Sequence, residues 1–272
     1  MINRDKICFY SSMYRGRSST YEIIDCAERF EVGGVELMNF SSELCTADIT
    51  VAREIGKYTK ARGLCLPCFS VGIDAITDPA QSIKKLQAYA EICSELEIPY
   101  LHHTIALDYR CGRLDPTERE KRFNTGIGIA LSLADFCAPL GVRTLIEPQG
   151  FVFNGIEWVD RTVRLSDERI GVVADVGNVL FTDTDPAEFI RTMGGRVCHS
   201  HLKDYTYKPD SAEYRSEKGR VFDAAEIGRG DIDFSGVFGA FRDINYNGFY
   251  ALEFENADGD TEVARVLDFL TR

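Results

Sequence analysis

Short apolar runs alternate with longer amphipathic stretches along the chain. Eight runs rich in Val, Ile, Phe and Tyr have the length and composition of strands. The stretches between them have the spacing of helices, and several begin at Asp followed by Pro, Ala or Thr and end at Gly. This alternation predicts a parallel sheet with crossover helices. The predicted strands cover residues 6–12, 34–39, 64–72, 100–106, 144–150, 171–178, 197–204 and 250–255.

The number of predicted strands favours a closed sheet. Eight strand-and-helix units are typical of a barrel, although the count alone leaves an open sheet as an alternative. The length of 272 residues is close to the ~250 residues of such a barrel. We therefore predict an α/β protein, a single (β/α)8 barrel that forms one domain over residues 1–272.

Two connections are longer than the others. They cover residues 107–115 and 205–232 and follow the fourth and seventh predicted strands. Connections that follow strands lie on the catalytic face of such barrels. These segments are therefore candidates for covering a substrate, and the alternative is that they are solvated insertions without a role.

Charge and cysteine content narrow the class of protein. The formal net charge of −12 and the pI of about 4.9 would repel a phosphate backbone, so no nucleic-acid partner is expected. The N-terminal segment lacks the pattern of a signal peptide, and no uninterrupted apolar run reaches the ~18 residues of a membrane span. We expect a soluble cytoplasmic protein with no membrane partner, in which most of the nine cysteines are reduced core thiols. Cys65 and Cys68 have CxxC spacing, but they lie in a strand-like run rather than at the start of a helix.

Four of the apolar runs end near a residue that can bind a metal ion: Glu147, Asp175, His201 and Glu253. The intervals of 28, 26 and 52 residues match one or two strand-and-helix units, so neighbouring strands could present all four groups at one end of a barrel. Each residue alone could instead form an ion pair, cap a turn or hold a backbone carbonyl. Together, three carboxylates and one imidazole suit Mn²⁺ or Mg²⁺, with Co²⁺ as an alternative, better than a structural zinc.

Five segments carry a resemblance to a known family: IEPQ (146–149), ADVGN (174–178), HSHLKDY (199–205), EIGRGDIDF (226–234) and NGFYALEFE (247–255). The chain resembles, over essentially its whole length, the sugar phosphate isomerase/epimerase group of the xylose isomerase-like TIM barrels. That group includes ketose 3-epimerases, hydroxypyruvate isomerases, inosose dehydratases and 3-dehydroshikimate dehydratases.

The resemblance implies that Glu147, Asp175, His201 and Glu253 bind one divalent metal ion. From the chemistry of the ligands we expect Mn²⁺ first, with Mg²⁺ or Co²⁺ as alternatives. Glu255 is an alternative for the last ligand because it points the same way along the strand. Glu253 is preferred, since it stands five residues after Gly248, as in the family.

The chain departs from many relatives at Asn178, where they carry a histidine three residues after the sixth-strand aspartate. An asparagine can hydrogen-bond a substrate hydroxyl but cannot shuttle a proton. The related endonucleases use several histidines in a cluster of metals, and this chain has only four in total. That branch of the superfamily is therefore not favoured.

The resemblance also implies a reaction. Isomerases and epimerases of this kind remove a proton from the carbon next to a carbonyl through a metal-stabilised enediolate. Glu147 and Glu253 are the candidate catalytic pair that removes and returns the proton. A lyase or dehydratase acting on a keto-sugar, inosose or 3-keto-glycoside with the same metal site is the first alternative. A non-catalytic sugar-binding subunit is the second.

The substrate is expected to be a small sugar or keto-polyol, and no nucleotide-binding glycine motif is present. Self-association is left open because no residue indicates an interface. Of the adjacent pair His102 and His103, alternation allows only one to face the barrel axis, and His103 is preferred. Glu36 could orient a substrate hydroxyl or tie the barrel together, and Lys203 could bind a substrate oxyanion or pair with a metal-binding carboxylate. The candidate substrate contacts are Glu36, His103, Asn178, Lys203 and Arg229.

Overall fold

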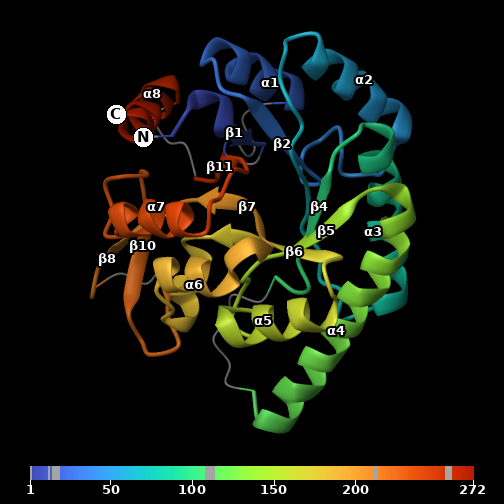
Figure 1. Ribbon diagram of the computed structural model, residues 1–272, viewed down its shortest axis with the longest axis vertical. Coiled ribbons are helices and arrows are strands. Elements are labelled where there is room, and N and C mark those ends of the chain that lie inside the picture. The colour runs from blue at the N-terminus through green and yellow to red at the C-terminus, as the bar shows by residue number, and fades with distance from the viewer. Residues whose placement is uncertain (1, 12, 14–18, 108–113, 211–213, 255–258) are drawn as a thin grey trace.

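The computed structural model describes residues 2–11, 13, 19–107, 114–210, 214–254 and 259–272. Eight parallel strands form a closed barrel in the order β1-β11-β7-β6-β5-β4-β3-β2 (Figure 1), which confirms the predicted fold class. Each predicted run contains one barrel strand or overlaps one, and each strand is shorter than the run. The strands are β1 (Ile7–Tyr10), β2 (Gly34–Met38), β3 (Phe69–Val71), β4 (Tyr100–His103), β5 (Arg143–Ile146), β6 (Ile170–Asp175), β7 (Val197–Leu202) and β11 (Tyr250–Leu252).

Helices surround the barrel (Figure 1). Asp78, Asp115 and Asp185 each precede a proline that begins a helix, and each aspartate side chain accepts a hydrogen bond from a backbone N–H of the first turn. These caps satisfy donors that a helix leaves unpaired. The helices are α1 (Thr20–Arg29), α2 (Ile49–Lys60), α3 (Pro79–Glu95), α4 (Pro116–Cys137), α5 (Gly155–Leu165), α6 (Pro186–Met193), α7 (Phe234–Asp243) and α8 (Asp260–Thr271), with short 3-10 helices η1 (Arg4–Lys6), η2 (Ala138–Leu140), η3 (Asn178–Thr182) and η4 (Gly194–Arg196).

A second, small sheet lies where the sequence predicted only a long connection. Strands β8 (Asp204–Tyr207), β9 (Tyr214–Arg215) and β10 (Val221–Ala225) pair antiparallel in the order β8-β10-β9. Of the other long connection, residues 108–113 lie outside the described residues.

Asp204 fastens the small sheet to the segment that follows it. Its carboxylate accepts hydrogen bonds from the backbone N–H groups of Tyr205, Gly228, Gly230 and Ile232 at 2.8–3.3 Å. Asp204 is only 2% exposed, so it is a buried anchor rather than a solvated loop carboxylate.

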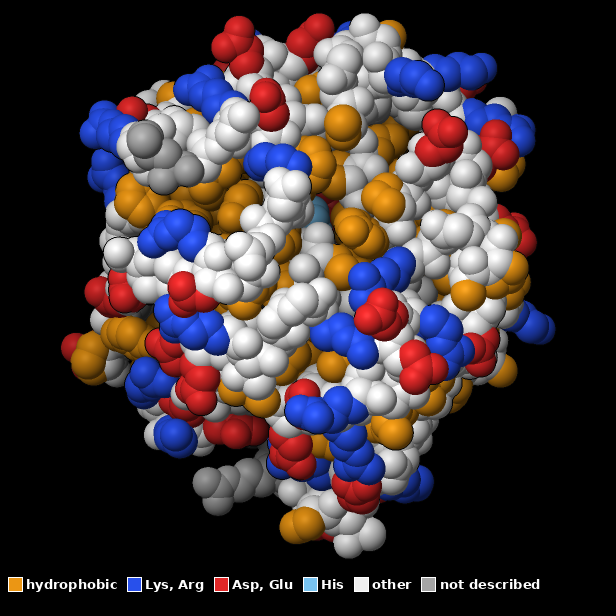
Figure 2. Space-filling model, viewed as in Figure 1, with side chains coloured by type: hydrophobic (Ala, Val, Ile, Leu, Met, Phe, Trp, Pro, Cys, Tyr) orange, Lys and Arg blue, Asp and Glu red, His pale blue; other side chains and the backbone are white. Residues whose placement is uncertain are grey.

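The surface carries acidic and basic side chains interspersed on the face shown in Figure 2, around a hollow ringed by hydrophobic side chains. Helix α4 together with η2, over Pro116–Leu140, is long and apolar enough to cross a membrane, which the search for uninterrupted apolar runs did not reveal. Of its most apolar window, 44% is buried in the protein. A core helix has the same length and composition, so this finding is weak evidence for a membrane segment.

Candidate metal centre

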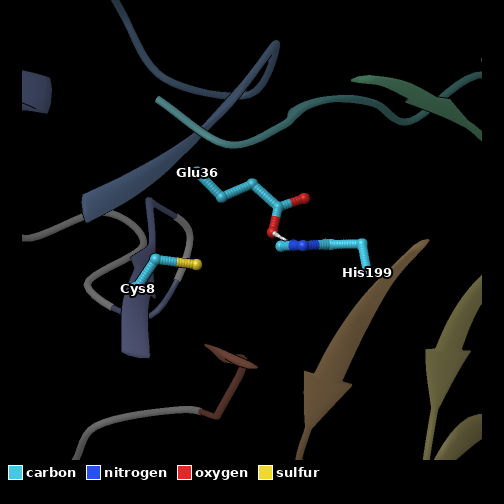
Figure 3. A group of neighbouring side chains, drawn as sticks. All are labelled: Cys8, Glu36 and His199. Carbon is cyan, nitrogen blue, oxygen red and sulfur yellow. Dashed lines mark hydrogen bonds and ion pairs between the residues drawn. The ribbon is translucent and has the colours of Figure 1, made fainter. Parts of the chain in front are cut away.

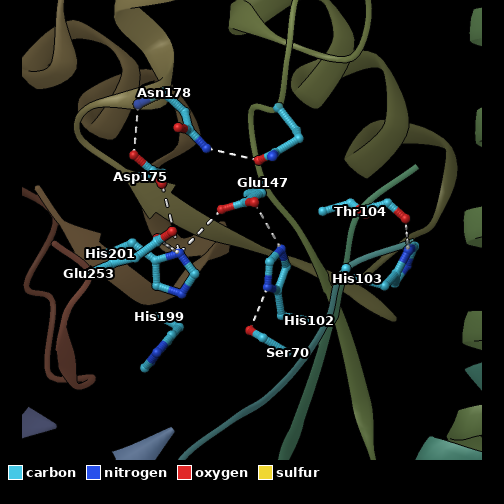
Figure 4. A network of polar contacts seen from close by, with 12 residues as sticks. Ser70, His102, His103, Thr104, Glu147, Asp175, Asn178, His199, His201 and Glu253 are labelled. Carbon is cyan, nitrogen blue, oxygen red and sulfur yellow. Dashed lines mark hydrogen bonds and ion pairs between the residues drawn. The ribbon is translucent and has the colours of Figure 1, made fainter. Parts of the chain in front are cut away.

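The four residues predicted to bind a metal ion meet at one end of the barrel (Figure 4). Asp175 ends β6 and His201 lies in β7, while Glu147 and Glu253 directly follow β5 and β11. One ligand atom from each residue lies within 4.8 Å of the others. They converge because parallel strands of a barrel place their carboxyl ends on the same face. Glu255, the alternative last ligand, lies outside the described residues. Glu253 stays the proposed last ligand because its side chain lies with the other three.

The donor atoms suit a divalent cation. His201 Nδ1 lies 2.9 Å from Glu253 Oε2 and 3.2 Å from Glu147 Oε2. These three atoms are buried and make no hydrogen bond within the described part of the chain. Buried polar atoms normally have partners, and charged ones are usually paired or bound to metal. Two carboxylate oxygens and an imidazole nitrogen that point at one another therefore fit a metal ion.

Lys203 balances the charge of the centre. Its Nζ lies 2.9 Å from Asp175 Oδ2 and 3.1 Å from Glu253 Oε1. Burial lowers the pKa of Lys203, but the negative charges of Asp175 and Glu253 outweigh burial and raise the pKa well above its usual value. A charged lysine and a divalent cation would together neutralise the three carboxylates. The geometry supports the role of Lys203 as a partner of the metal-binding carboxylates.

Asn178 joins this centre through its backbone and its side chain. The backbone N–H of Asn178 donates to Asp175 Oδ1 at 2.7 Å, its Nδ2 donates to Gln149 Oε1 at 2.9 Å, and its Oδ1 accepts from Lys203 at 3.3 Å. The asparagine thus orients one carboxylate and the lysine. Gln149 was not among the predicted site residues, although it belongs to the IEPQ segment.

Glu36 lies beneath His201 inside the barrel. Its Oε1 is 3.1 Å from His201 Nε2, its Oε2 is 2.7 Å from His199 Nε2, and Ser70 Oγ donates to it. Figure 3 shows Glu36 between Cys8 and His199. Burial opposes ionisation, but the two histidines outweigh it and hold the pKa of Glu36 well below its usual value.

This arrangement sets the tautomer of His201. The carboxylate of Glu36 accepts a hydrogen bond from the Nε2–H of His201, which leaves the Nδ1 lone pair directed toward the other candidate ligands. Glu36 is fully buried and does not line the cavity above the centre. Of its two predicted roles, the geometry supports tying the barrel together rather than contacting substrate.

Glu36→Gln is expected to weaken metal binding by roughly 10- to 100-fold, the usual effect of removing a carboxylate behind a metal-binding histidine. The measurement is the Kd for Mn²⁺ by isothermal titration calorimetry. Glu43→Gln is the matched control, since Glu43 is bonded to Thr20 and is not one of the metal-centre residues. An unchanged Kd in Glu36→Gln would show that Glu36 does not orient His201.

The preference for His103 over His102 is corrected by the structure. His102 Nε2 lies 3.5 Å from Glu147 Oε1, and His102 Nδ1 lies 2.7 Å from Ser70 Oγ. His103 points away from the centre, with its Nδ1 3.3 Å from the carbonyl of Thr104 (Figure 4), and burial lowers its pKa to about 4. The register pairs His102 with Ser70 and Leu145, which fixes the side that each histidine faces.

Arg229 is not brought to the centre. Its side chain is 65% exposed and pairs at 2.9 Å with Glu226, which also binds Arg265. Glu226 lines the cavity above the centre, whereas Arg229 does not. The structure therefore gives no support to a direct contact between Arg229 and a substrate.

A cavity of 620 Å³ opens above the metal centre. Tyr10 lines it, with its ring centroid 5.0 Å from that of His201. Burial raises the pKa of Tyr10 well above its usual value, so the phenol keeps its proton and can donate a hydrogen bond. Tyr10 was missed in the sequence, where the only signal is its place at the end of the first apolar run.

Gly177 allows Lys203 to reach the centre. A Cβ at this position would lie 2.6 Å from the ring of Tyr205 and would also collide with the Lys203 stem. Gly177→Ala is expected to cost about 1–3 kcal/mol of unfolding free energy, because the two side chains must move in a packed site. Chemical denaturation tests this against Gly195→Ala, where no atom lies within 4 Å of an added Cβ. Equal stability of the two variants would contradict the close packing.

Three carboxylates and an imidazole thus meet on one face of a closed eight-stranded barrel, at the neighbouring strands β5, β6, β7 and β11, where they could hold a metal ion. The model of the family described as the xylose isomerase-like TIM barrel matches residues 24–272. The chain belongs to this family, as its sequence motifs predicted.

Among curated proteins, the inosose dehydratase of Clostridium perfringens (strain 13 / Type A) is 29% identical over 127 residues, which cover 44% of this chain and 41% of that protein. The chain thus spans less than half of the length of this relative. Among solved structures, the IOLI protein with a zinc atom has a TM-score of 0.78 at 14% identity and covers 97% of this chain and 96% of that one. The 3-keto-D-glucoside 4-epimerase of E. coli has a TM-score of 0.75 at 16% identity, with 97% of each chain covered. At such low sequence identities, the similarity of these structures to this chain shows a shared fold.

Proposed function

We propose that this protein is a divalent-metal-dependent sugar isomerase or epimerase that removes a proton from the carbon next to a carbonyl. The observation that carries the proposal is the meeting of Glu147 and Glu253 at one centre with Asp175 and His201. The two glutamates reach that centre from β5 and β11, which β6 and β7 separate in the barrel. Two carboxylates that approach one substrate from different strands can act on its opposite faces.

Each residue has a defined part in this reaction. Glu147, Asp175, His201 and Glu253 would hold the cation, which when bound would stabilise negative charge on the substrate oxygens. One of the two glutamates takes the proton from carbon, and the C–H electron pair moves into the enediolate. The same glutamate can return the proton to the neighbouring carbon while the hydroxyl proton of the first carbon passes to the former carbonyl oxygen, or the opposite glutamate can return a proton to the other face of the first carbon. The first outcome is isomerisation, and the second is epimerisation.

Other groups orient this machinery. Burial raises the pKa of Glu147, but His102 and His201 outweigh burial and lower it, so the carboxylate is ionised. Lys203 and Asn178 hold Asp175, and Glu36 holds His201. Because residue 178 is an asparagine and not a histidine, we assign proton transfer to the two glutamates. Mn²⁺ is the proposed metal, with Mg²⁺ or Co²⁺ as alternatives, because three of the four ligands are carboxylates.

A dehydratase is the second candidate, and the curated relatives favour it because those matched are inosose dehydratases. The same enediolate would then expel a β-hydroxyl group, which leaves as water with the proton that the glutamate took from carbon. Incubation of the Mn²⁺-loaded protein in D₂O with ketoses, inososes and 3-keto-glycosides, followed by NMR, separates the two reactions. An isomerase or epimerase gives a deuterated product with all its hydroxyl groups, whereas a dehydratase gives an unsaturated product. Metal binding without any reaction on the panel would instead favour a sugar-binding subunit.

A further inference from the structure

A second cavity, with a volume of 890 Å³, lies at the end of the barrel opposite the metal centre. Its lining includes Tyr100 at the start of β4, Cys198 near the start of β7 and Phe249 just before β11. The candidate metal ligands instead lie near the carboxyl ends of their strands. No described residue lines both this cavity and the one above the metal centre. This lower cavity is therefore separate from the site described above.

Part of the lower cavity is apolar. Its apolar lining comes from the segments before β3, β4 and β11 and from the end of α3, and consists of Leu64, Leu66, Pro67, Leu96, Pro99 and Phe249. Small-molecule sites are typically clefts of roughly 300–1,000 Å³ that combine mostly apolar walls with a few polar groups. The lower cavity has the size and the wall of such a site.

Helix α2 brings positive charge to the lower cavity. Arg53, Lys57 and Lys60 line it from one face of the helix, as their spacing of about one turn requires. Arg53 pairs with Glu95 at 2.7 Å, whereas neither lysine forms an ion pair with another described residue. The one other acidic residue of the described lining is Glu97. In a chain with a net charge of −12, two unpaired lysines beside one such carboxylate form a local surface that favours an anion.

Two arginines behind the lining add to this positive charge. Burial raises the pKa of the Cys198 thiol, which lines the cavity, and the positive charges of Arg143 and Arg196 oppose that rise. Arg143 Nε and Arg196 Nη1 are buried and have no hydrogen-bond partner among the described residues. Buried cationic groups without a partner favour a negative charge nearby.

His199 offers a hydrogen-bond acceptor to the lower cavity. It is fully buried and belongs to the lining. Its Nε2 lies 2.7 Å from Glu36 Oε2 (Figure 3). Because a carboxylate only accepts hydrogen bonds, Nε2 carries the proton, and Nδ1 of the neutral ring has a lone pair. Nδ1 makes no hydrogen bond within the part of the chain that the structure describes, so a ligand hydroxyl can donate to it.

We propose that the lower cavity binds a hydroxylated aromatic carboxylate. The aromatic rings pack on the apolar wall, the carboxylate lies near Lys57 and Lys60, and the hydroxyl donates to His199 Nδ1. Each part of this ligand matches one chemical feature of the lining. The ligand makes no contact with the four candidate metal ligands, so this inference does not depend on the proposed reaction.

The test uses naphthalene probes and metal-free protein, so that no carboxylate can coordinate a cation. The full probe is 6-hydroxy-2-naphthoate; its methyl ester lacks the charge, and 2-naphthoate lacks the hydroxyl. Their Kd values are measured by isothermal titration calorimetry. We expect the ester to bind about tenfold more weakly than the full probe, a ratio of ~1.4 kcal/mol that two exposed ion pairs can supply. Loss of one hydrogen bond should make 2-naphthoate bind about fivefold more weakly.

A double variant locates the carboxylate. Lys57→Gln combined with Lys60→Gln should bring the ratio of the Kd values of ester and full probe close to one, while the Kd of the ester stays the same. Both lysines are exposed, so the variant is expected to fold. The matched control is Lys84→Gln combined with Lys85→Gln, which makes the same change of charge at exposed positions of α3 outside the described lining.

Equal affinity for the full probe and its ester in the unmodified protein would overturn the proposal. A ratio that survives in the Lys57 and Lys60 variant would also overturn it, as would a ratio that falls equally in the control, because net charge alone would then attract the probe. Equal affinity for the full probe and 2-naphthoate would overturn the contact with His199. None of these results depends on turnover, so each leaves the proposed reaction to its own test.

Discussion

Glu147→Gln is expected to lower turnover by roughly 10²- to 10⁴-fold, the range for loss of a positioned acid–base group. Glutamine keeps the shape of the side chain and one oxygen for the metal, but it cannot accept a proton from carbon. The measurement is kcat at a metal concentration that saturates the variant, so that weaker metal binding does not determine the result.

Two observations make this test specific. Glu157→Gln is the control, because Glu157 lies on α5 with a side chain that is 66% exposed, and it should keep full activity. The melting temperature of Glu147→Gln should stay close to that of the unmodified protein when metal is present. A Glu147→Gln variant that binds metal and retains more than a tenth of the activity would contradict the role of Glu147 as the base.

Metal binding is expected to produce the largest change in stability. Without a cation, the ligand oxygens of Glu147, Asp175 and Glu253 lie within 4.8 Å of one another, and their negative charges repel. A metal ion at a thousand times its Kd should raise the free energy of unfolding by about 4 kcal/mol, if it binds only the folded chain. For a chain of this size this corresponds to a rise of roughly 10 °C in melting temperature.

Thermal unfolding with and without Mn²⁺, Mg²⁺ or Co²⁺ measures this shift. His201→Ala should abolish most of it, because its imidazole supplies the one nitrogen atom among the four proposed ligands. His103→Ala is the matched control, since His103 is equally buried but points away from the centre. If none of the three ions changes the melting temperature of the unmodified protein, the four residues do not form a metal site.

The barrel and the grouping of the four candidate ligands could be predicted from the sequence because both depend on short-range patterns. Apolar runs separated by helical stretches predict parallel strands, and the carboxyl ends of such strands share one face. Glu147, Asp175 and His201 lie at or near the ends of such runs, so their meeting needs only the strand order. The roles of the residues around them depend on contacts between distant parts of the chain, which no local pattern indicates.

Glu36 and the adjacent histidines illustrate that difference. Glu36 bonds to His201 across 165 positions of the chain, and nothing near Glu36 in the sequence marks its partner. The side that His102 faces depends on the register of β4 with β3 and β5. A shift of one residue would have turned His103 toward the metal centre instead. The small sheet β8-β10-β9 was also unpredicted, because its strands are short and the first of them follows β7 with only Lys203 between them.

The central claim is that this protein removes a proton from a carbon next to a carbonyl with the help of a bound divalent metal. The most direct test is solvent-deuterium incorporation into ketoses, inososes and 3-keto-glycosides, followed by NMR, with protein first stripped of metal and then refilled with Mn²⁺. We predict no incorporation by the stripped protein and incorporation into at least one class of substrate after refilling, which Glu147→Gln abolishes. Incorporation that is equally fast without metal, or that persists in Glu147→Gln, would contradict the claim.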